Sequence, residues 1–136
     1  MATLHLMVGL PGSGKTTEAI RLAQMHHALR LTPDDWHLHL FGNDFYNDAL
    51  KDMQHDIRHT KIEELMWNTA EKLLQLNLDV ILDFGCWAKS ERDEFRQKAH
   101  AIGANFKIHY MDCPLETIWE RLNRRNNSSV DGSLFY

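Results

Sequence analysis

The chain has 136 residues, of which 43% are hydrophobic, and a formal charge of −4 at pH 7. This length suits one domain with one core, and the negative charge argues against general nucleic-acid binding, which depends on neutralising many phosphates. The sequence contains no signal-peptide pattern and no apolar stretch long enough to cross a bilayer, and its two cysteines are too few for a disulfide framework. We therefore expect a single cytoplasmic domain, residues 1–136, without membrane contact.

The N-terminal stretch predicts a strand, a loop and a helix in that order. Residues 3–8 (TLHLMV) form a short apolar run typical of a strand, and residues 17–29 have the pattern of a helix. Between them, residues 9–16 read GLPGSGKT, which is a glycine, four free positions and then Gly-Lys-Thr. In this strand–loop–helix context the motif predicts a loop that binds the phosphates of a nucleotide.

The residue types of this loop suit that chemistry. Gly12 and Gly14 allow the backbone to curl until several N–H groups point at the phosphates. Lys15 is long enough to reach the β- and γ-phosphates, and the hydroxyl of Thr16 can bind a magnesium ion. The predicted nucleotide-binding residues are Gly9, Pro11, Gly12, Ser13, Gly14, Lys15, Thr16 and Thr17.

The next part of the chain predicts a short strand, a brief helical turn and a long helix. Residues 29–31 form the strand, and the turn opens at Asp34 and Asp35 and ends near Gly42. The long helix lies within residues 48–76, because apolar residues recur there three and four apart. Its predicted core face comprises Ile62, Leu65, Met66, Thr69, Leu73 and Leu74.

A β-branched run and a capping pattern follow. Residues 79–83 (DVILD) predict a strand that ends in the carboxylate of Asp83. Ser90 is the predicted N-cap of the next helix, and Gly103 is its predicted stop. Residues 106–111 alternate as one more strand, and a last helix begins after it.

This alternation of strands and helices predicts a three-layer α/β/α fold with a parallel sheet, of the P-loop NTPase type. Ligands of such sheets bind outside the C-terminal ends of the strands. The predicted strand ends carry Gly9, Asp34-Asp35, Asp83 and Asp112. Residues 126–136 are polar, and we expect a mobile tail or a truncated lid there.

The carboxylates at these strand ends suit phosphoryl transfer, which needs a metal ion and a base for the proton of the acceptor. Asp35 is the candidate base, although Asp34 or Asp35 can also cap the short helix. Asp83 is the candidate magnesium ligand together with Thr16, and its alternative role is that of a turn residue.

Positive charge gathers near the C-terminus at Arg121, Arg124 and Arg125. Arg121 and Arg125 are four apart and share one helix face, from which they can cover the phosphates as a lid. The alternative is a solvated face that complements the C-terminal dipole of the last helix.

Nine histidines raise the question of a metal site. His55 and His59 are four apart on the predicted long helix, but zinc-finger Cys/His spacing and the glutamate of a metalloprotease helix are both missing. We expect solvated surface histidines.

The motifs together resemble a known family. They are GLPGSGKTT at 9–17, Asp34-Asp35-Trp36, VILD at 80–83, Glu91-Arg92, Asp112-Cys113-Pro114, and Arg121 to Arg125-Asn126. This set is similar to the small P-loop kinases labelled AAA-domain ATP-binding proteins, which include the 5′-kinase domain of phage polynucleotide kinase, chloramphenicol phosphotransferase and the zeta toxins. The resemblance implies an ATP- and Mg²⁺-dependent kinase that phosphorylates a hydroxyl of a small molecule, nucleotide or nucleic-acid end. It implies catalytic roles for Lys15, Asp35, Arg121 and Arg125.

The sequence departs from the family pattern in two places, which bear on the acceptor and on the number of strands. Family members carry an arginine just after the Asp-aromatic pair, where this chain has His37 and Leu38, and this argues against a polynucleotide acceptor. The family continues past the lid into a last strand, so we expect a sheet that is one strand short, or a truncated chain. A nucleotide-binding module or degenerate kinase without transferase activity is the alternative function.

A mechanical ATPase of the ring-forming AAA type is less favoured, because Phe84 rather than a glutamate follows Asp83. The expected assembly state is a monomer or a weak dimer.

Overall fold

The computed structural model describes residues 1–10, 13–44, 46–85, 88–111 and 119. Within these residues, four parallel strands form one sheet in the order β2-β3-β1-β4. The strands are β1 (Thr3–Val8), β2 (Leu29–Leu31), β3 (Val80–Gly85) and β4 (Asn105–Tyr110). The helices are α1 (Lys15–His26), α2 (Pro33–Phe41), α3 (Ala49–Gln75) and α4 (Lys89–Ala101). The predicted α/β fold with a parallel sheet is confirmed.

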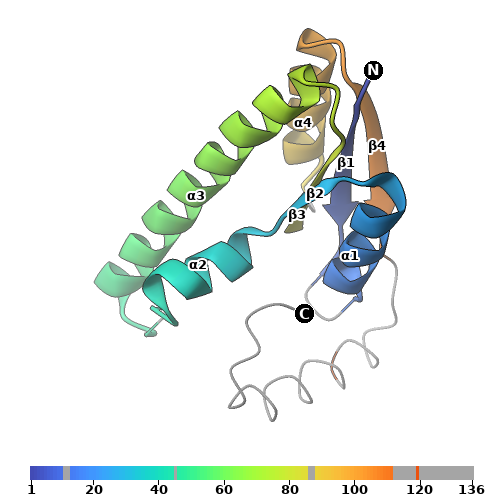
Figure 1. Ribbon diagram of the computed structural model, residues 1–136. Coiled ribbons are helices and arrows are strands. Elements are labelled where there is room, and N and C mark those ends of the chain that lie inside the picture. The colour runs from blue at the N-terminus through green and yellow to red at the C-terminus, as the bar shows by residue number, and fades with distance from the viewer. Residues whose placement is uncertain (11–12, 45, 86–87, 112–118, 120–136) are drawn as a thin grey trace.

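Helices cover both faces of the sheet, and each face has its own apolar cluster (Figure 1). Leu4 and Leu6 of β1 pack in the larger cluster, together with Met66 of α3. Met7, which points to the opposite face, packs in the smaller cluster with Leu22 of α1. Strands that are buried on both sides read as continuous apolar runs, and this is why β1 and β3 are recognisable in the sequence.

Helix α1 begins at Lys15 and ends at His26, earlier at both ends than the predicted residues 17–29. Gly14 precedes it with a φ of 90°, a left-handed conformation that glycine adopts at little cost. His27 follows the helix as its C-cap, also in the left-handed region, with a φ of 51°. Lys15 of the predicted phosphate loop, residues 9–16, therefore belongs to the first turn of the helix.

Helix α3 matches its predicted span, but Leu65 and Thr69 of its predicted core face are not part of the core. Asp48 caps the helix, and its carboxylate accepts hydrogen bonds from the N–H groups of Leu50 and Lys51, both at 3.1 Å. The buried residues are Ile62, Met66, Ala70 and Leu74, each four after the last. Leu65 is 56% exposed, because a residue one position from Met66 lies about 100° around the helix.

The N-terminal half of α3 leaves the sheet and packs beside α2 (Figure 1). Ile62 marks the first buried apolar residue along α3, and the preceding turns contact α2 instead of the strands. This pair of helices forms an arm beyond the edge of the sheet. The arm carries Asp35 at one end of α2, close to the strands.

The predicted capping of α4 by Ser90 is wrong. The helix begins at Lys89 with Ala88 as N-cap and no side-chain capping bond, so Ser90 lies inside the first turn. Gly103, with a φ of 76°, follows the end of the helix at Ala101, in agreement with the predicted stop.

Several sequence predictions lie outside the described residues. They include the last helix from Asp112, the candidate lid with Arg121, Arg124 and Arg125, the last strand of the sheet and the tail at 126–136. Among the helices that the structure describes, none combines the length and the apolar character that crossing a membrane requires.

Candidate functional site

The C-terminal edge of the sheet brings together three segments that are far apart in sequence. Because the strands are parallel and ordered β2-β3-β1, the segment after β2, the end of β3 and the loop after β1 are neighbours. The N–H of Gly9 donates to the carbonyl of Gly85 at 3.4 Å, which joins the loop to the end of β3. This edge is where parallel sheets bind their ligands.

Asp83 is the centre of the site. Its side chain is buried, and its Oδ1 lies 2.5 Å from Nζ of Lys15. Its Oδ2 accepts hydrogen bonds from Oγ1 of Thr16 at 2.8 Å and from Oγ1 of Thr32 at 3.1 Å. A buried carboxylate needs such partners, since an unpaired charge is costly in a protein interior. Lys15 and Thr16 of the predicted phosphate loop thus form one network with Asp83 at the end of β3.

The described part of the phosphate loop is tightly built. Ser13 donates its N–H to the carbonyl of Leu10 at 3.1 Å, and its hydroxyl is buried without a hydrogen-bond partner within the described residues. A Cβ added at Gly9 would lie 2.7 Å from Oγ of Ser13 and 3.0 Å from Cβ of Met111. The loop therefore has no room for a side chain at Gly9, and it holds a buried hydroxyl that an incoming ligand can satisfy.

The other predicted loop residues are only partly described. Thr17 lies exposed in the first turn of α1, while Pro11 and Gly12 lie outside the described residues.

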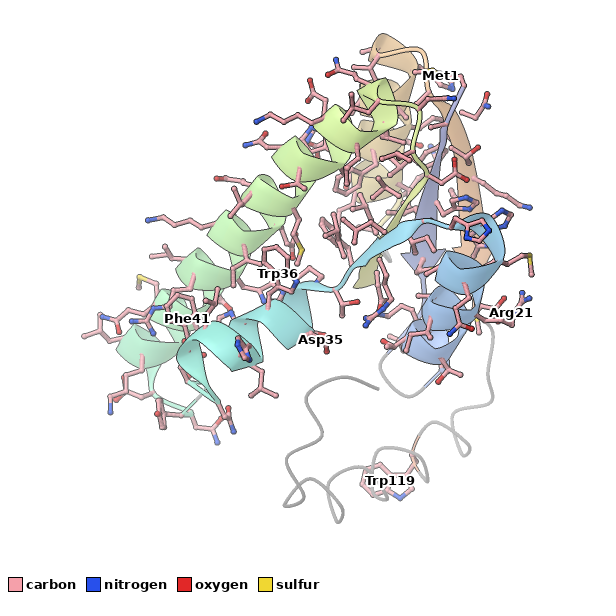
Figure 2. The ribbon with its side chains drawn as sticks, viewed as in Figure 1. Met1, Arg21, Asp35, Trp36, Phe41 and Trp119 are labelled. Atoms are coloured by element: carbon pink, nitrogen blue, oxygen red, sulfur yellow. The ribbon has the colours of Figure 1, made fainter. Side chains whose placement is uncertain are left out.

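Asp35 lies in the first turn of α2, on the side that faces α1 (Figure 2). It is 9% exposed, and its Oδ2 accepts a hydrogen bond from Nη1 of Arg30 at 3.2 Å. Burial raises the pKa of Asp35, although the hydrogen bond and charge of Arg30 oppose this shift. The side chain of Asp34, by contrast, is 81% exposed. Of the two neighbouring carboxylates, Asp35 is the one that turns toward the strands.

Two residues that the sequence motifs do not single out, Arg30 and Thr32, connect these carboxylates. Nη1 of Arg30 donates to Oγ1 of Thr32 at 2.5 Å as well as to Asp35, and Thr32 in turn donates to Asp83. A continuous path of hydrogen bonds therefore links Asp35 to Asp83. The signal in the sequence was an arginine inside a short apolar strand, since a charge in such a position needs a partner.

The aromatic residues on α2 and just after it are exposed and are not part of the core. Trp36, Phe41 and Tyr46 are 37%, 45% and 61% exposed. Arg58 of α3 lies over the ring of Phe41, with its guanidinium carbon 4.8 Å from the ring centroid. Phe45 and Trp87 lie outside the described residues.

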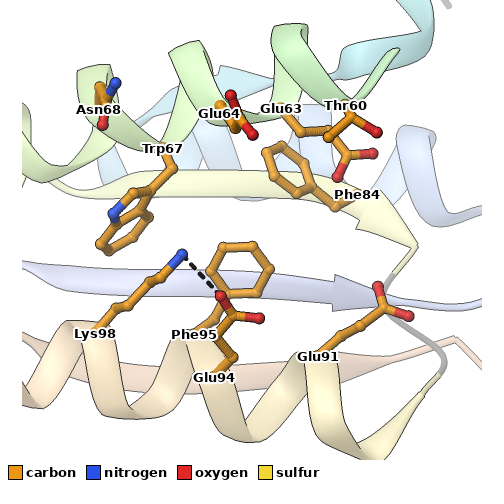
Figure 3. A pocket seen from close by; sticks show the side chains of 10 residues that line it. All are labelled: Thr60, Glu63, Glu64, Trp67, Asn68, Phe84, Glu91, Glu94, Phe95 and Lys98. Carbon is orange, nitrogen blue, oxygen red and sulfur yellow. Dashed lines mark ion pairs between the residues drawn. The ribbon is translucent and has the colours of Figure 1, made fainter. Parts of the chain in front are cut away.

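A separate cavity of about 310 Å³ opens between α3 and α4 (Figure 3). Its lining combines the aromatic rings of Trp67, Phe84 and Phe95 with four glutamates, Glu63, Glu64, Glu91 and Glu94. Lys98 lies in the same lining but is paired with Glu94 at 3.1 Å. Four carboxylates repel a triphosphate, so this cavity is unsuited to the phosphates of a nucleotide.

The fold and the sequence match known proteins. The AAA domain family matches residues 4–134. A Chloroflexus aurantiacus protein provisionally named a kinase has a TM-score of 0.78 at 19% identity, over 95% of this chain and 69% of that one. The APS kinase CysC of Mycobacterium tuberculosis, in complex with AMPPNP and APS, has a TM-score of 0.55 at 17% identity, over 96% of this chain and 71% of that one.

A chain of the Pnkp1/Rnl/Hen1 complex has a TM-score of 0.64 at 22% identity, over 88% of this chain but only 38% of that one. No significant match is found among curated proteins. The chain belongs to the AAA domain family. Its fold is that of the P-loop kinases, and the resemblance to them inferred from the motifs is confirmed.

Proposed function

We propose that this protein is an ATP-dependent phosphotransferase that moves the γ-phosphate of ATP to a hydroxyl of a small molecule, nucleotide or nucleic-acid end. The observation that carries the proposal is the network at Asp83, where one buried carboxylate holds the lysine and the hydroxyl of the phosphate loop at 2.5 and 2.8 Å. This arrangement supports the proposal, because a cationic amine, a hydroxyl and a carboxylate are groups that phosphoryl transfer from ATP uses.

In the proposed mechanism, the ion pair between Lys15 and Asp83 breaks when ATP binds. The ammonium group of Lys15, now paired with Asp83, moves to the β- and γ-phosphates. Oxygens of Thr16 and Asp83, which lie 2.8 Å apart, are the hard donors that suit Mg²⁺, so the residues present fit this ion. When bound there, Mg²⁺ neutralises part of the charge on the β- and γ-phosphates.

Asp35 is the proposed general base. It accepts the proton of the acceptor hydroxyl while a bond forms between the acceptor oxygen and the γ-phosphorus and the bond to the β–γ bridging oxygen breaks. The path from Asp35 through Arg30 and Thr32 to Asp83 keeps the two carboxylates in a defined relation. In our proposal, Arg121 and Arg125 stabilise the charge on the migrating phosphoryl group.

Nucleotide binding without transfer is the second candidate function. It is favoured by the ion pair of Arg30 and Asp35, whose atoms Nη1 and Oδ2 are 3.2 Å apart, since this pairing opposes the rise that burial causes in the pKa of Asp35. Phe84, the residue after Asp83, packs against Phe95 with ring centroids 5.6 Å apart. This position therefore carries no carboxylate that could activate water. A mechanical ATPase is therefore not proposed.

ATP–Mg²⁺ turnover against a panel of acceptors tests the proposal. The panel holds nucleosides, oligonucleotide 5′ ends, sugars and amide antibiotics, and the variants are Lys15→Ala and Asp35→Asn. Phosphoryl transfer to one acceptor class is expected, with Asp35→Asn lowering kcat by roughly 100-fold or more while ATP binding persists, since a positioned base contributes about 10²–10⁴-fold. Asp34→Asn is the matched control, because that carboxylate is exposed.

Binding of ATP that depends on Lys15, without transfer to any acceptor, would favour the second function. Undiminished phosphoryl transfer by Asp35→Asn would support the kinase function and contradict the assignment of Asp35 as the general base.

A further inference from the structure

Three histidines gather between α2 and α3, away from the phosphate loop. His37 comes from α2, while His55 and His59 come from successive turns of α3. Each offers one ring nitrogen, and these three atoms all lie within 4.8 Å of one another. The expectation that these histidines are solvated was wrong for His37, which is 3% exposed. His55 and His59 are half-buried.

Each of the three rings is hydrogen-bonded to a carboxylate on one side. Nε2 of His37 lies 2.7 Å from Oδ1 of Asp44, and Nδ1 of His55 contacts the same oxygen. Nε2 of His59 lies 3.2 Å from Oε1 of Glu63. A carboxylate that accepts the N–H of one ring nitrogen sets the tautomer and leaves the other nitrogen as a metal ligand, which is the usual arrangement around protein-bound zinc.

The opposite nitrogens of two rings are unsatisfied. Nδ1 of His37 and Nδ1 of His59 are both buried, and neither has a hydrogen-bond partner within the described part of the chain. Buried polar atoms without partners are rare in native proteins, and a bound ion is one of their recognised explanations. The rings also line a cavity of about 230 Å³, together with Asp34, Leu38, Gly42 and Asn43.

We propose that His37, His55 and His59 bind one divalent transition-metal ion, with Zn²⁺ as the best-fitting ion. Three imidazole nitrogens suit Zn²⁺, Co²⁺ or Cu²⁺ and are poor ligands for Mg²⁺ or Ca²⁺, which prefer oxygen. The cavity supplies room for a water molecule in the fourth tetrahedral position. Asp44 orients two of the rings, and Arg58 holds its second oxygen at 3.0 Å.

An ion bound at this site would link α2 to α3. Its ligands come from both helices of the arm, that is, from α2 and from the N-terminal half of α3. His37 is on the same short helix as Asp35, so a bound ion restrains the helix that carries the candidate base. The ion thus acts as a positioning element for α2, and its binding requires neither ATP nor an acceptor.

A second histidine group provides the matched control. His5, His26 and Asp79 also bring three possible ligand atoms within 4.8 Å of one another. There, however, Nδ1 of His5 is already 2.9 Å from Nε2 of His109, and Nε2 of His5 is 3.2 Å from Asp79. Both ring nitrogens of the buried member are therefore engaged, and we propose no ion at this group.

The test begins with the full chain, from which a chelator has removed any bound metal. This protein is titrated with Co²⁺ in a buffer that contains excess Mg²⁺ and no nucleotide. We expect one Co²⁺ per chain by calorimetry, with the visible absorption of a tetrahedral Co²⁺ ion, and a higher Tm in Zn²⁺. His59→Gln should weaken binding by roughly 100-fold or more, and Glu63→Gln by about 10–100-fold, as removal of an outer carboxylate does. His26→Gln should bind as the wild type does, and circular dichroism checks the folding of each variant.

Absence of tight Co²⁺ binding by the wild type would overturn the proposal. Binding that His59→Gln leaves intact, or that His26→Gln abolishes, would overturn it as well. Because no nucleotide is present, this result is separate from that of the kinase assay, and Lys15→Ala should retain the metal.

Discussion

At the scale of single residues, the site depends on contacts that leave little freedom. Asp83 accepts hydrogen bonds from Lys15, Thr16 and Thr32, which come from two different segments of the chain. The two successive carboxylates Asp34 and Asp35 differ because the first turn of α2 points one to solvent and the other toward Arg30. The sequence motif contains both residues, and only the orientation of the helix shows which carboxylate is exposed and which one pairs with Arg30.

Gly9→Ala tests the close packing of the phosphate loop. Its Cβ would lie 2.7 Å from Oγ of Ser13, so the loop must shift, and we expect ATP affinity to fall by roughly tenfold or more, since about 1.4 kcal/mol corresponds to tenfold. Calorimetric titration with ATP measures this. The control is Gly103→Ala, which meets nothing within 4 Å at a φ of 76° and should cost about 1–2 kcal/mol of stability without changing ATP affinity. Unchanged ATP binding by Gly9→Ala would contradict the packing argument.

At the scale of elements, α3 has two halves with different neighbours. Its C-terminal half packs on the sheet through a row of residues four apart, and its N-terminal half packs on α2. The apolar periodicity in the sequence predicts the helix and most of this face. It does not separate Leu65 from Met66, because both are apolar and only the crossing angle of the helix on the sheet decides which is buried.

Adjacent substitutions in α3 test this correction. Met66 is 0% exposed and Leu65 is 56% exposed. We expect Met66→Ala to lower the free energy of unfolding by about 2–5 kcal/mol, because it leaves a cavity in the core. Leu65→Ala should change it by about 0.5 kcal/mol or less. Urea denaturation followed by circular dichroism compares the two, and equal losses would mean that α3 is rotated from the position described.

At the scale of the whole molecule, polar groups also connect the strands within the sheet. His5 of β1 is buried and contacts His109 of β4 at 2.9 Å and Asp79, just before β3, at 3.2 Å. Oδ1 of Asp79 accepts the N–H of Thr3 at 2.9 Å. These contacts join three neighbouring strands at one face, and they make the fold sensitive to protonation.

The stability of the fold should fall as the solution becomes acidic. Burial lowers the pKa of His5 below 6.5 against the opposing effect of Asp79, and burial, with the charges of His5 and Lys107, lowers the pKa of His109. Groups whose pKa is lower in the folded state stabilise it fully above the unfolded value of about 6.5 and lose this effect below it. Urea midpoints should therefore decline from about pH 6.5 downward.

His5→Gln should reduce that decline, and His27→Gln, a change at an exposed histidine of α1's C-cap, should not. A decline that is identical in the wild type and in His5→Gln would assign the acid sensitivity to other groups.

The sequence by itself determined the glycine-rich loop motif of residues 9–16, the alternating strands and helices, the parallel sheet and the family. These features depend on local patterns: a glycine-rich motif, apolar runs and helical periodicity, each of which acts over a few residues. The tertiary structure alone decided that Arg30 and Thr32 connect Asp35 to Asp83, and that His37 meets His55 and His59. Such contacts depend on how separate elements cross, and no local pattern encodes the neighbour that an inward-facing polar side chain will meet.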